Sequence, residues 1–541
     1  VNDLKRAAKY RNQPYPQPNW RFRLRPSLAE VLAAVERLRG LARKRAADLA
    51  GVAKAVPSEG KSGEEKNGEE KERAAKPADS IGPLEISFDL ETRNGHIACA
   101  GLAHNYQEAI CIPFMCVERL TGYWTEDEEA EIVYALWGLL THPGVVVVGQ
   151  YLHYDCQYTY RYWHFVPRRI EDTIIKQHVV FAGLPKKLDF QASMYCEHYV
   201  YWKDDSKEWN KHLGEEQLWA YNCEDCVRTL ECSRVEDGII KQFQLEEVNS
   251  FQQEMFWPVL EAMQRGVRID KGVRSRMGME LLEEMTKREE YFLAVLGHPL
   301  NPRSPKQMAS LFYDDLKQPL QRSRTSGNPT LDEEALDRLA SREPLIRPLV
   351  KRIKEHRSLG VFLGTFIAAP LDIDERMRCS YNISGAYTYR LSSSKNAFGG
   401  GANLQTIPAG KRAKEPEDLE LPNIRKMFVP DPGYDFFNLD LDRADLQVVV
   451  WEADDQDLKQ ALRLGVDMHC FNALEMFNIK GIPAEELVES HPNYHERRGQ
   501  IGEDKRQKMK SWVHGTNYGG GPRTMAINCG LVIKEAEAMQ A

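Results

Sequence analysis

The sequence has no long hydrophobic run. Its longest stretch of consecutive Val, Ile or Leu residues is Val145–Val148, far short of the ~20 apolar residues that cross a bilayer. No basic segment followed by an apolar stretch opens the chain, which argues against a secretory leader. The first residue is Val1 rather than Met, so we expect the start to be trimmed. These features predict a globular chain that does not bind a membrane.

Disulfide frameworks and a uniformly basic surface are also missing. The eleven cysteines are scattered and odd in number, which favours a reducing cytoplasm over a secreted, disulfide-bonded fold. The net charge of −8 argues against a uniformly basic coat, but it permits a nucleic-acid enzyme with its positive charge confined to one groove. A length of 541 residues excludes a single small module and predicts about three to four domains.

Composition and periodicity divide the chain. Residues 57–80 have almost no bulky apolar side chain and are dense in Glu, Lys, Gly and Ser, which predicts a disordered linker. We assign no role to the partly helical extension 1–56 before it, in which Ser27 can cap a helix. Buried strands in LEISFDLET and GVVVVGQ alternate with helical stretches and predict an α/β domain over 81–245.

The later part of the chain has a different pattern. Residues 246–375 show mostly helical periodicity. Strands are expected again around MRCSYNIS and YDFFNLDLD, followed by helices, which makes 376–541 an α+β region. The predicted fold class is therefore a multidomain chain with α/β and α+β parts.

A set of acidic residues marks the α/β domain. Asp89 and Glu91 stand two apart on a predicted strand and share one of its faces. Asp155 follows the aliphatic strand, and Asp225 lies four residues after Tyr221 on a predicted helix, so that phenol and carboxylate share a face. Four carboxylates suit two Mg²⁺ ions ~3.5–4 Å apart that activate a water for attack on a phosphodiester. Mn²⁺ is a substitute, and Tyr221 would orient the water.

The order of these motifs resembles the DEDD superfamily of 3′–5′ exonucleases in its tyrosine form. The resemblance implies an RNase H-like proofreading domain that acts on the 3′ end of single-stranded DNA. It makes Asp89, Glu91, Asp155 and Asp225 metal ligands. Tyr151 departs from the pattern, because proofreading domains usually carry Asn there.

A zinc site is the alternative for the same region. Cys223 and Cys226 form a C-x-x-C pair with Cys232 and His198 nearby. Zinc needs four ligands, usually from two such pairs, and this pair lies inside the predicted catalytic helix. We therefore interpret the two cysteines as small residues that pack the helix.

Two segments of the helical region introduce a second resemblance. Residues 254–270, EMFWPVLEAMQRGVRID, and 300–308, LNPRSPKQM, resemble the start of the polymerase module of family A DNA polymerases, which makes 246–375 a thumb. Residues 387–408, YTYRLSSSKNAFGGGANLQTIP, resemble the family's T-x-R-L-S-S and N-L-Q-N-I-P. The resemblance implies that Arg390 and Gln405 contact the primer-template duplex. Tyr389 stands where the family usually has Gly.

The segment FFNLDLDRADLQ resembles motif A of the family. The resemblance makes Asp440 a catalytic carboxylate that ends a strand and holds both Mg²⁺ ions of the polymerase site. Asp445 falls where the family places a Glu against C2′ of the nucleotide. Its side chain is one methylene shorter, which is expected to weaken the rejection of ribonucleotides.

The segment RQKMKSWVHGTNYGG resembles motif B. Arg506, Lys510, His514 and Tyr518 recur every four residues, which on an α-helix makes a stripe ~18 Å long. Arg506 and Lys510 would neutralise the dNTP phosphates, with Lys510 assisting the pyrophosphate leaving group. His514, where the family has Phe or Tyr, would pack on the sugar and base, and Tyr518 would lie near the templating base. His469, in a D-x-H motif, is a further phosphate contact.

Motif C of the family, His-Asp-Glu or similar, is missing from the sequence. We therefore expect an incomplete right-hand polymerase: a thumb, part of a palm and the start of fingers, truncated before motif C. The substitutions favour a bacteriophage-type member, working in a bacterial or phage-infected cytoplasm with primer-template DNA, dNTPs and a processivity factor. Two alternatives remain: the DNA-binding half of a split polymerase completed by a separate chain that supplies motif C, and a stand-alone DEDD exonuclease.

Overall fold

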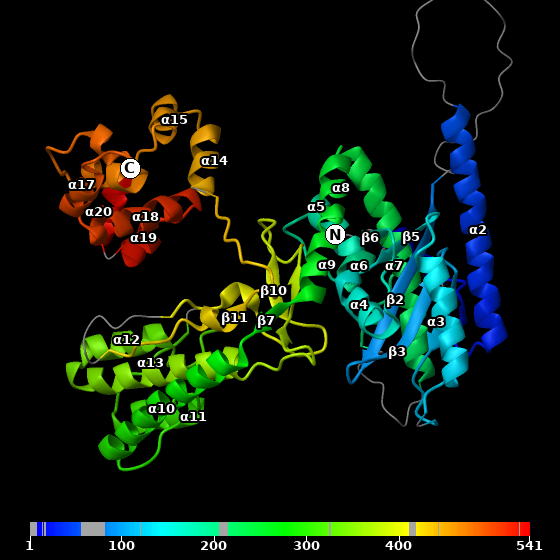
Figure 1. The fold of residues 1–541 in the computed structure, drawn as a ribbon, viewed down its shortest axis with the longest axis horizontal. Coiled ribbons are helices and arrows are strands. Elements are labelled where there is room, and N and C mark those ends of the chain that lie inside the picture. Colours follow the sequence, from blue (N-terminus) through cyan, green and yellow to red (C-terminus); the bar gives the residue numbers. More distant parts are fainter. Residues whose placement is uncertain are drawn as a thin grey trace, which may run out of the picture. The chain divides into compact units, whose positions relative to one another are not determined.

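In the computed structural model, the chain forms two compact units, Val1–Asp435 and Phe436–Ala541 (Figure 1). Because the linker predicted at 57–80 lies outside the described residues, its structure stays a prediction. Over the described residues, no helix combines the length and apolar character that crossing a membrane requires. The structure describes residues 8–12, 14–15, 18–55, 82–119, 121–204, 215–323, 326–410, 418–441, 443–529 and 531–540.

A six-stranded sheet forms the centre of the first unit. The strands β2, β3 and β4 pair in antiparallel fashion, and β5 and β6 continue the sheet parallel to β2. All four valines of β5 are buried, as expected for a parallel strand covered on both faces. In order across the sheet, the strands are β1 (Arg21–Arg23), β4 (Glu108–Pro113), β3 (His96–Ala103), β2 (Leu84–Arg93), β5 (Val145–Gly149) and β6 (Ile170–Asp172).

Helices cover both faces of this sheet. One face packs against α2 and α3 through residues such as Leu102 and Ile112. The other face packs against α7 through Cys99 and Cys111. The helices of this region are α2 (Leu28–Ala55), α3 (Glu126–Leu140), α4 (Leu152–Tyr158), α5 (Thr173–Val180), α6 (Leu188–Tyr195) and α7 (Glu216–Gln242), with a π-helical turn at Thr159–Trp163.

The amino-terminal extension has a structural role that the sequence did not predict. Strand β1 pairs in parallel with β4. Helix α2 lies beside α3 (Figure 1), and Val31, Val35 and Leu38 share one core with Leu136 of α3. Ser27 caps α2, as predicted, because its hydroxyl accepts the backbone N–H of Glu30 at 3.4 Å. The described part of the extension thus packs as one body with the α/β sheet.

The region after α7 is mostly helical, as predicted. Helix α10 packs along α13, while Phe256 and Leu260 of α9 belong to the core of the large sheet. The carboxylate of Asp270 caps α10 by accepting the N–H of Val273 at 2.9 Å. The helices are α8 (Glu246–Glu254), α9 (Phe256–Arg265), α10 (Lys271–Leu296), α11 (Pro305–Ala309), α12 (Glu333–Arg342) and α13 (Arg347–Val361).

Short strands complete the first unit. The strand prediction at MRCSYNIS is confirmed by β8 (Arg376–Met377) and β9 (Cys379–Asn382). Strand β9 pairs with β10 (Ser392–Lys395), and β8 lies in a three-stranded sheet with β7 (Val267–Ile269) and β11 (Phe428–Val429).

The strand prediction at YDFFNLDLD is wrong. Residues 434–441 have no regular structure, and Phe437 and Leu439 are 86% and 92% exposed. A strand needs a neighbouring strand to satisfy its backbone groups, and the described residues of the second unit contain none.

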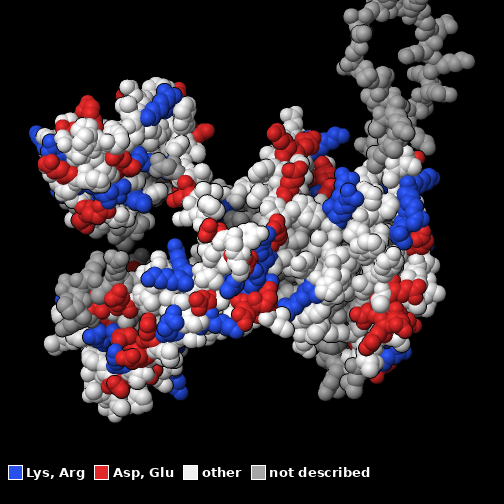
Figure 2. Space-filling view, viewed as in Figure 1, with Lys and Arg blue, Asp and Glu red and all other residues white. Residues whose placement is uncertain are grey.

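The regular secondary structure in the described part of the second unit is helical, with irregular segments between the helices. Met468, Met509 and Trp512 contribute to a single apolar core. Figure 2 shows Lys and Arg interspersed with Asp and Glu over the face in view, without a uniformly basic coat. The helices are α14 (Ala444–Glu452), α15 (Gln456–Arg463), α16 (Met468–Met476), α17 (Tyr494–Ile501), α18 (Glu503–Asn517), α19 (Pro522–Cys529) and α20 (Ile533–Gln540).

The packing of α2 predicts a stability effect. Leu38 is 3% exposed, so Leu38→Ala should lower the free energy of unfolding by about 2–5 kcal/mol, through lost apolar burial and a cavity. Arg37→Ala, at an exposed position of the same helix, is the matched control. Urea unfolding followed by tryptophan fluorescence measures both, and equal midpoints for the two variants would show that α2 is not docked.

Candidate functional site

Three carboxylates meet between β2 and α7. Asp89 pairs with Gly101 and Glu91 with Cys99 across β2 and β3, which places both acids on the face that α7 covers. Asp225 projects from α7 toward them. One oxygen from each of the three carboxylates lies within 4.8 Å of the others. The structure therefore brings together residues that are far apart in the sequence, as the motif order predicted.

Asp155 lies next to this cluster. It is 4% exposed on α4, and its Oδ1 accepts the backbone N–H of Leu90, the residue between Asp89 and Glu91, at 2.9 Å. The charge of Asp89 adds to the effect of burial in raising the pKa of Asp155. The fourth predicted acid is thus adjacent to the other three.

Asp172 holds the start of α4, a role that the sequence analysis missed. Its carboxylate accepts the backbone N–H groups of Tyr151 at 3.0 Å, Leu152 at 2.7 Å and Ile174 at 2.9 Å. Tyr151 has a left-handed backbone with φ of +66°, a conformation that favours Asn, the residue usual there in proofreading domains. The detectable signal was an Asp between a short strand and a helix, which is typical of an N-cap.

Polar donors surround the carboxylates. Asn222 donates its amide N–H to Oδ2 of Asp89 at 2.8 Å. Trp202 donates its indole N–H to Oδ1 of Asp225 at 2.6 Å. The ammonium of Lys203 donates to the Tyr221 phenol oxygen at 2.8 Å and to Oδ2 of Asp225. Sequence reasoning did not find Asn222, Trp202 or Lys203.

Electrostatics make the cluster a candidate cation site. Burial raises the pKa of Asp89 to about 7, and the charge of Asp225 adds to the rise. Burial, followed by the charges of Asp89 and Asp225, likewise raises the pKa of Glu91 well above its ordinary value. Repulsion of this kind is relieved by a divalent cation, and carboxylate oxygens are the ligands that Mg²⁺ and Mn²⁺ prefer. The donor set therefore fits a hard divalent ion.

The cysteines of α7 pack this helix against the sheet and do not form a second group of metal ligands. Cys223 and Cys226 are fully buried with Cys99 and Cys111. A Cβ at Gly101 would lie 2.6 Å from the Cys226 sulfur, so the missing side chain lets α7 approach the sheet. Over the described residues, Asp89, Glu91 and Asp225 form the one group of His, Cys, Asp and Glu ligands within reach of a metal ion.

The predicted duplex-binding residues lie on the β9–β10 hairpin and the turn that follows it. Gln405 donates its amide N–H to the Leu391 carbonyl at 2.9 Å and accepts the Ser393 hydroxyl at 2.8 Å. These bonds join the segment that contains Arg390 to the segment that contains Gln405. Arg390 is exposed. Tyr389 has φ of +61°, which explains why Gly is usual there, and its ring centroid lies 4.2 Å from that of His178.

Most of the predicted nucleotide-binding residues lie along α18. Arg506, Lys510 and His514 belong to this helix, and Tyr518 follows its last residue. The His514 ring centroid lies 6.1 Å from that of His469, and the Tyr518 hydroxyl lies 3.4 Å from Oδ2 of Asp445. The second unit therefore brings the residues of motif B next to those of motif A and the D-x-H motif.

Asp467 anchors Arg506 in this group. Its Oδ2 accepts the Arg506 guanidinium at 2.8 Å and the Tyr494 hydroxyl at 2.9 Å. Burial alone would raise the pKa of Asp467, but these bonds lower it to about 2. Burial lowers the pKa of His469 to about 4, so its ring is neutral at pH 7.

Asp440 is placed differently from the prediction. It lies in the exposed irregular segment before α14 rather than at the end of a strand.

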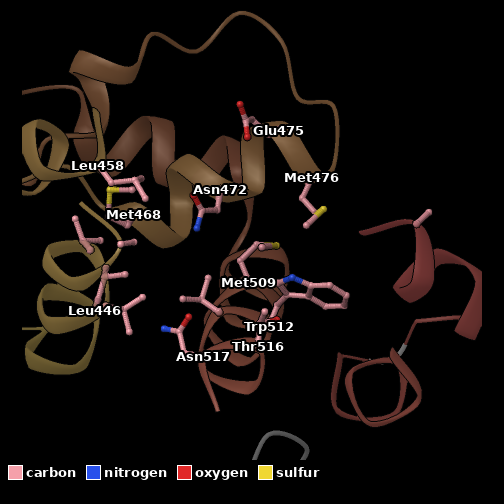
Figure 3. Close-up of a pocket in the computed structure, with 15 residues that line it drawn as sticks. Leu446, Leu458, Met468, Asn472, Glu475, Met476, Met509, Trp512, Thr516 and Asn517 are labelled. Atoms are coloured by element: carbon pink, nitrogen blue, oxygen red, sulfur yellow. The ribbon is translucent and has the colours of Figure 1, made fainter. Parts of the chain in front are cut away.

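The second unit also contains an apolar pocket of about 530 Å³, which lies between α14, α16 and α18 (Figure 3). Met468, Met509 and Trp512 line it, with Asn472 and Asn517 as polar groups.

Comparison with known proteins identifies the carboxy-terminal part. Residues 272–541 match the model of DNA polymerase family A. This segment belongs to that family. Because the family A segment covers the region after the carboxylate cluster, a stand-alone exonuclease with an unrelated carboxy-terminal region is not favoured.

Several curated proteins are similar in sequence to parts of this chain. DNA polymerase I of Pseudomonas aeruginosa is 26% identical over 478 residues, which cover 84% of this chain and 48% of the relative. DNA polymerase I of Geobacillus stearothermophilus is 28% identical over 276 residues, 50% of this chain and 28% of the relative. The chain thus spans about half the length of these relatives or less.

The solved POL domain of Pol1 from M. smegmatis, in complex with DNA primer-template and dNTP, has a similar fold. Its TM-score is 0.56 at 19% identity, covering 84% of this chain and 71% of that one. The mixed α/β multidomain fold predicted from the sequence is confirmed.

The raised pKa of Asp89 predicts a pH-dependent stability. The folded chain keeps this proton up to about pH 7, whereas an unfolded Asp loses it near its ordinary 3.8. Because the folded state binds more protons in this window, stability falls as the pH rises from about 4 to about 7. In metal-free protein, Asp89→Asn should therefore raise the melting temperature by several degrees at pH 8 and have little effect at pH 4.

The matched control is Asp48→Asn, at an exposed position on α2. Thermal scans in a chelator measure all three proteins. Added Mg²⁺ is expected to stabilise the wild type more than Asp89→Asn. A wild type as stable as Asp89→Asn at pH 8 without metal would contradict the raised pKa.

Proposed function

We propose that this protein is a template-directed DNA polymerase of family A, with a 3′–5′ proofreading exonuclease in an RNase H-like domain. The family match of residues 272–541 supports the synthetic activity. The cluster of Asp89, Glu91 and Asp225 is the observation that carries the exonuclease. The substrates are primer-template DNA, dNTPs and the 3′ end of a single strand.

In the polymerase, the primer 3′ hydroxyl attacks the α-phosphate of a dNTP and pyrophosphate leaves. Arg506 and Lys510 neutralise the phosphates, with His469 as a neutral donor beside them. His514 packs against the sugar and base, and Tyr518 lies near the templating base. Arg390 and Gln405 contact the duplex. Asp440, which is exposed, would supply a carboxylate to the metal ions of the polymerase site.

In the exonuclease, a water oxygen forms the new bond to phosphorus while the bond from phosphorus to the preceding 3′ oxygen breaks. That oxygen leaves as a hydroxyl with a proton from the water. Tyr221 orients the water through its phenol. Asp89, Glu91, Asp155 and Asp225 would hold the metal ions.

Mg²⁺, or Mn²⁺ in its place, would be held by these carboxylates in the exonuclease and by Asp440 in the polymerase. When bound, such ions lower the pKa of water and neutralise charge on the phosphoryl oxygens. The clustering of acids with raised pKa values supports a cation in the exonuclease site.

Two residues set this chain apart from the usual family pattern. Asp445 is shorter than the Glu expected against C2′, and its carboxylate lies by the Tyr518 hydroxyl. His514 replaces an aromatic Phe or Tyr. We propose that sugar discrimination is weakened as a result, and that the chain is a bacteriophage-type member. A processivity factor stays a predicted partner.

Separate variants test the two activities in the full-length protein. Asp440→Ala should lower primer extension by about a hundredfold or more and leave degradation of a single-stranded 3′ end intact. Asp89→Ala should do the reverse, because its carboxylate belongs to the other cluster. Gel assays with labelled primers measure both, with Asp457→Ala, an exposed acid of α15, as control. Synthesis that survives Asp440→Ala would refute the polymerase assignment, and 3′ degradation that survives Asp89→Ala would refute the exonuclease.

A further inference from the structure

A lysine lies inside the carboxylate cluster. Lys203 belongs to the segment between α6 and α7, and its ammonium donates to the phenol of Tyr221 at 2.8 Å. The same ammonium forms an ion pair with Asp225, in which the lysine side chain is 22% exposed and the aspartate 6%. Burying an ammonium costs free energy unless it is paired, so the contacts with Tyr221 and Asp225 stabilise Lys203 in this position.

The segment that carries Lys203 is clamped to α7. The Arg228 guanidinium lies 4.1 Å from the Trp202 ring centroid and donates to the carbonyl of His198 at 2.9 Å. Trp202 in turn donates to Asp225 at 2.6 Å. Arg228 is itself 1% exposed. The backbone next to Lys203 is therefore held against the helix that presents Tyr221 and Asp225.

A lysine with a purely structural role would weaken the binding of metal by the carboxylates. Its positive charge competes with any cation for Asp225, so it must lower the affinity of the cluster for divalent metal. Its hydrogen bond to Tyr221, however, fixes the orientation of the phenol. Because the phenol oxygen accepts from Lys203, the phenol proton points away from the ammonium and can be donated to a water beside the carboxylates.

We propose that Lys203 is a positioning residue of the 3′–5′ exonuclease, which holds the Tyr221 phenol and the Asp225 carboxylate so that the attacking water is aligned. This inference rests on the proposed exonuclease function. Lys203 acts through Tyr221. It aligns the water, and at the same time it lowers the affinity of the carboxylates for metal. Two opposite effects follow when Lys203 is removed: hydrolysis slows and metal binding tightens.

Kinetics with a single-stranded oligonucleotide test the first effect. Lys203→Gln is expected to lower kcat about 10- to 100-fold, less than the ~100- to 1000-fold for a donor that contacts the reacting atoms, because Lys203 acts through Tyr221. KM is expected to change less than about threefold. Lys203→Arg should recover part of kcat, because it retains charge and donors. Lys241→Ala, at an exposed position in the last turn of α7, should behave as the wild type. A rise in KM with unchanged kcat would show a DNA-binding lysine and overturn the proposal.

A double-mutant cycle tests whether Lys203 acts through the phenol. In a Tyr221→Phe background the hydroxyl that Lys203 contacts is gone. Lys203→Gln should then lower kcat by less than about threefold, because coupled residues are not additive. Full additivity of the two losses would overturn the proposal.

Metal binding gives a readout apart from activity. Titration of the full-length chain with Mn²⁺, followed by the electron paramagnetic resonance signal of the free ion, is expected to show about three- to tenfold tighter binding to Lys203→Gln, since a competing charge is removed. Weaker binding together with lower kcat would show a folding defect and overturn the proposal.

The failure of the exonuclease assignment is distinguishable from the failure of this inference. If wild-type protein degrades no 3′ end, the proposed function fails and the role of Lys203 in hydrolysis fails with it. If wild-type activity is abolished by Asp89→Ala but unaffected by Lys203→Gln, only the inference on Lys203 is refuted.

Discussion

The packing of α7 across the antiparallel strands is the contact on which the first unit depends. Gly101 leaves no side chain at the crossing point, and a Cβ there would lie 2.6 Å from both Asn222 and Cys226. The helix therefore lies close enough to the sheet for Asp225 to reach Asp89 and Glu91. Small buried cysteines fill the rest of this contact, so the residues that resemble a zinc motif serve the geometry of the carboxylates instead.

That close approach has an electrostatic consequence. Burial first, and then the charge of Asp225, raises the pKa of Asp89, so ionising the closely packed acids carries a free-energy cost. Neutral donors such as Asn222 and the indole of Trp202 relieve part of it, and Lys203 adds a positive charge. The proposed cation site thus contains an ammonium that pairs with one of its own carboxylates, Asp225.

Helix α4 links this cluster to the hairpin that carries the predicted duplex contacts. Asp155 faces the carboxylates, while Gln157 accepts the Ser380 hydroxyl at 3.2 Å and Tyr158 donates to the Ala397 carbonyl at 3.1 Å. In the second unit, the ion pair of Asp467 and Arg506 ties α16 to α18. Asp172 in the first unit and Asp467 in the second are buried, and each accepts several donors at the start of a helix that carries predicted site residues.

Local sequence periods are enough to predict which neighbouring residues share a face of a helix or strand. The alternation around Asp89 and Glu91, the four-residue intervals along α18 and the apolar run of β5 each depend on a helical or strand period, which neighbouring residues decide. Tyr389 and Tyr151 could be recognised as departures from the usual Gly and Asn. The left-handed backbone that explains why Gly and Asn are usual at these positions is visible in the structure alone.

Tertiary packing sets which residues from distant parts of the chain come into contact. Asn222, Trp202, Lys203 and Asp172 reach the site from segments without a motif, because their role depends on packing rather than on spacing. The docking of α2 on α3 and the irregular backbone at Asp440 have the same cause: a helix face or a strand acquires its structure from the partner that covers it, and the local sequence does not specify that partner.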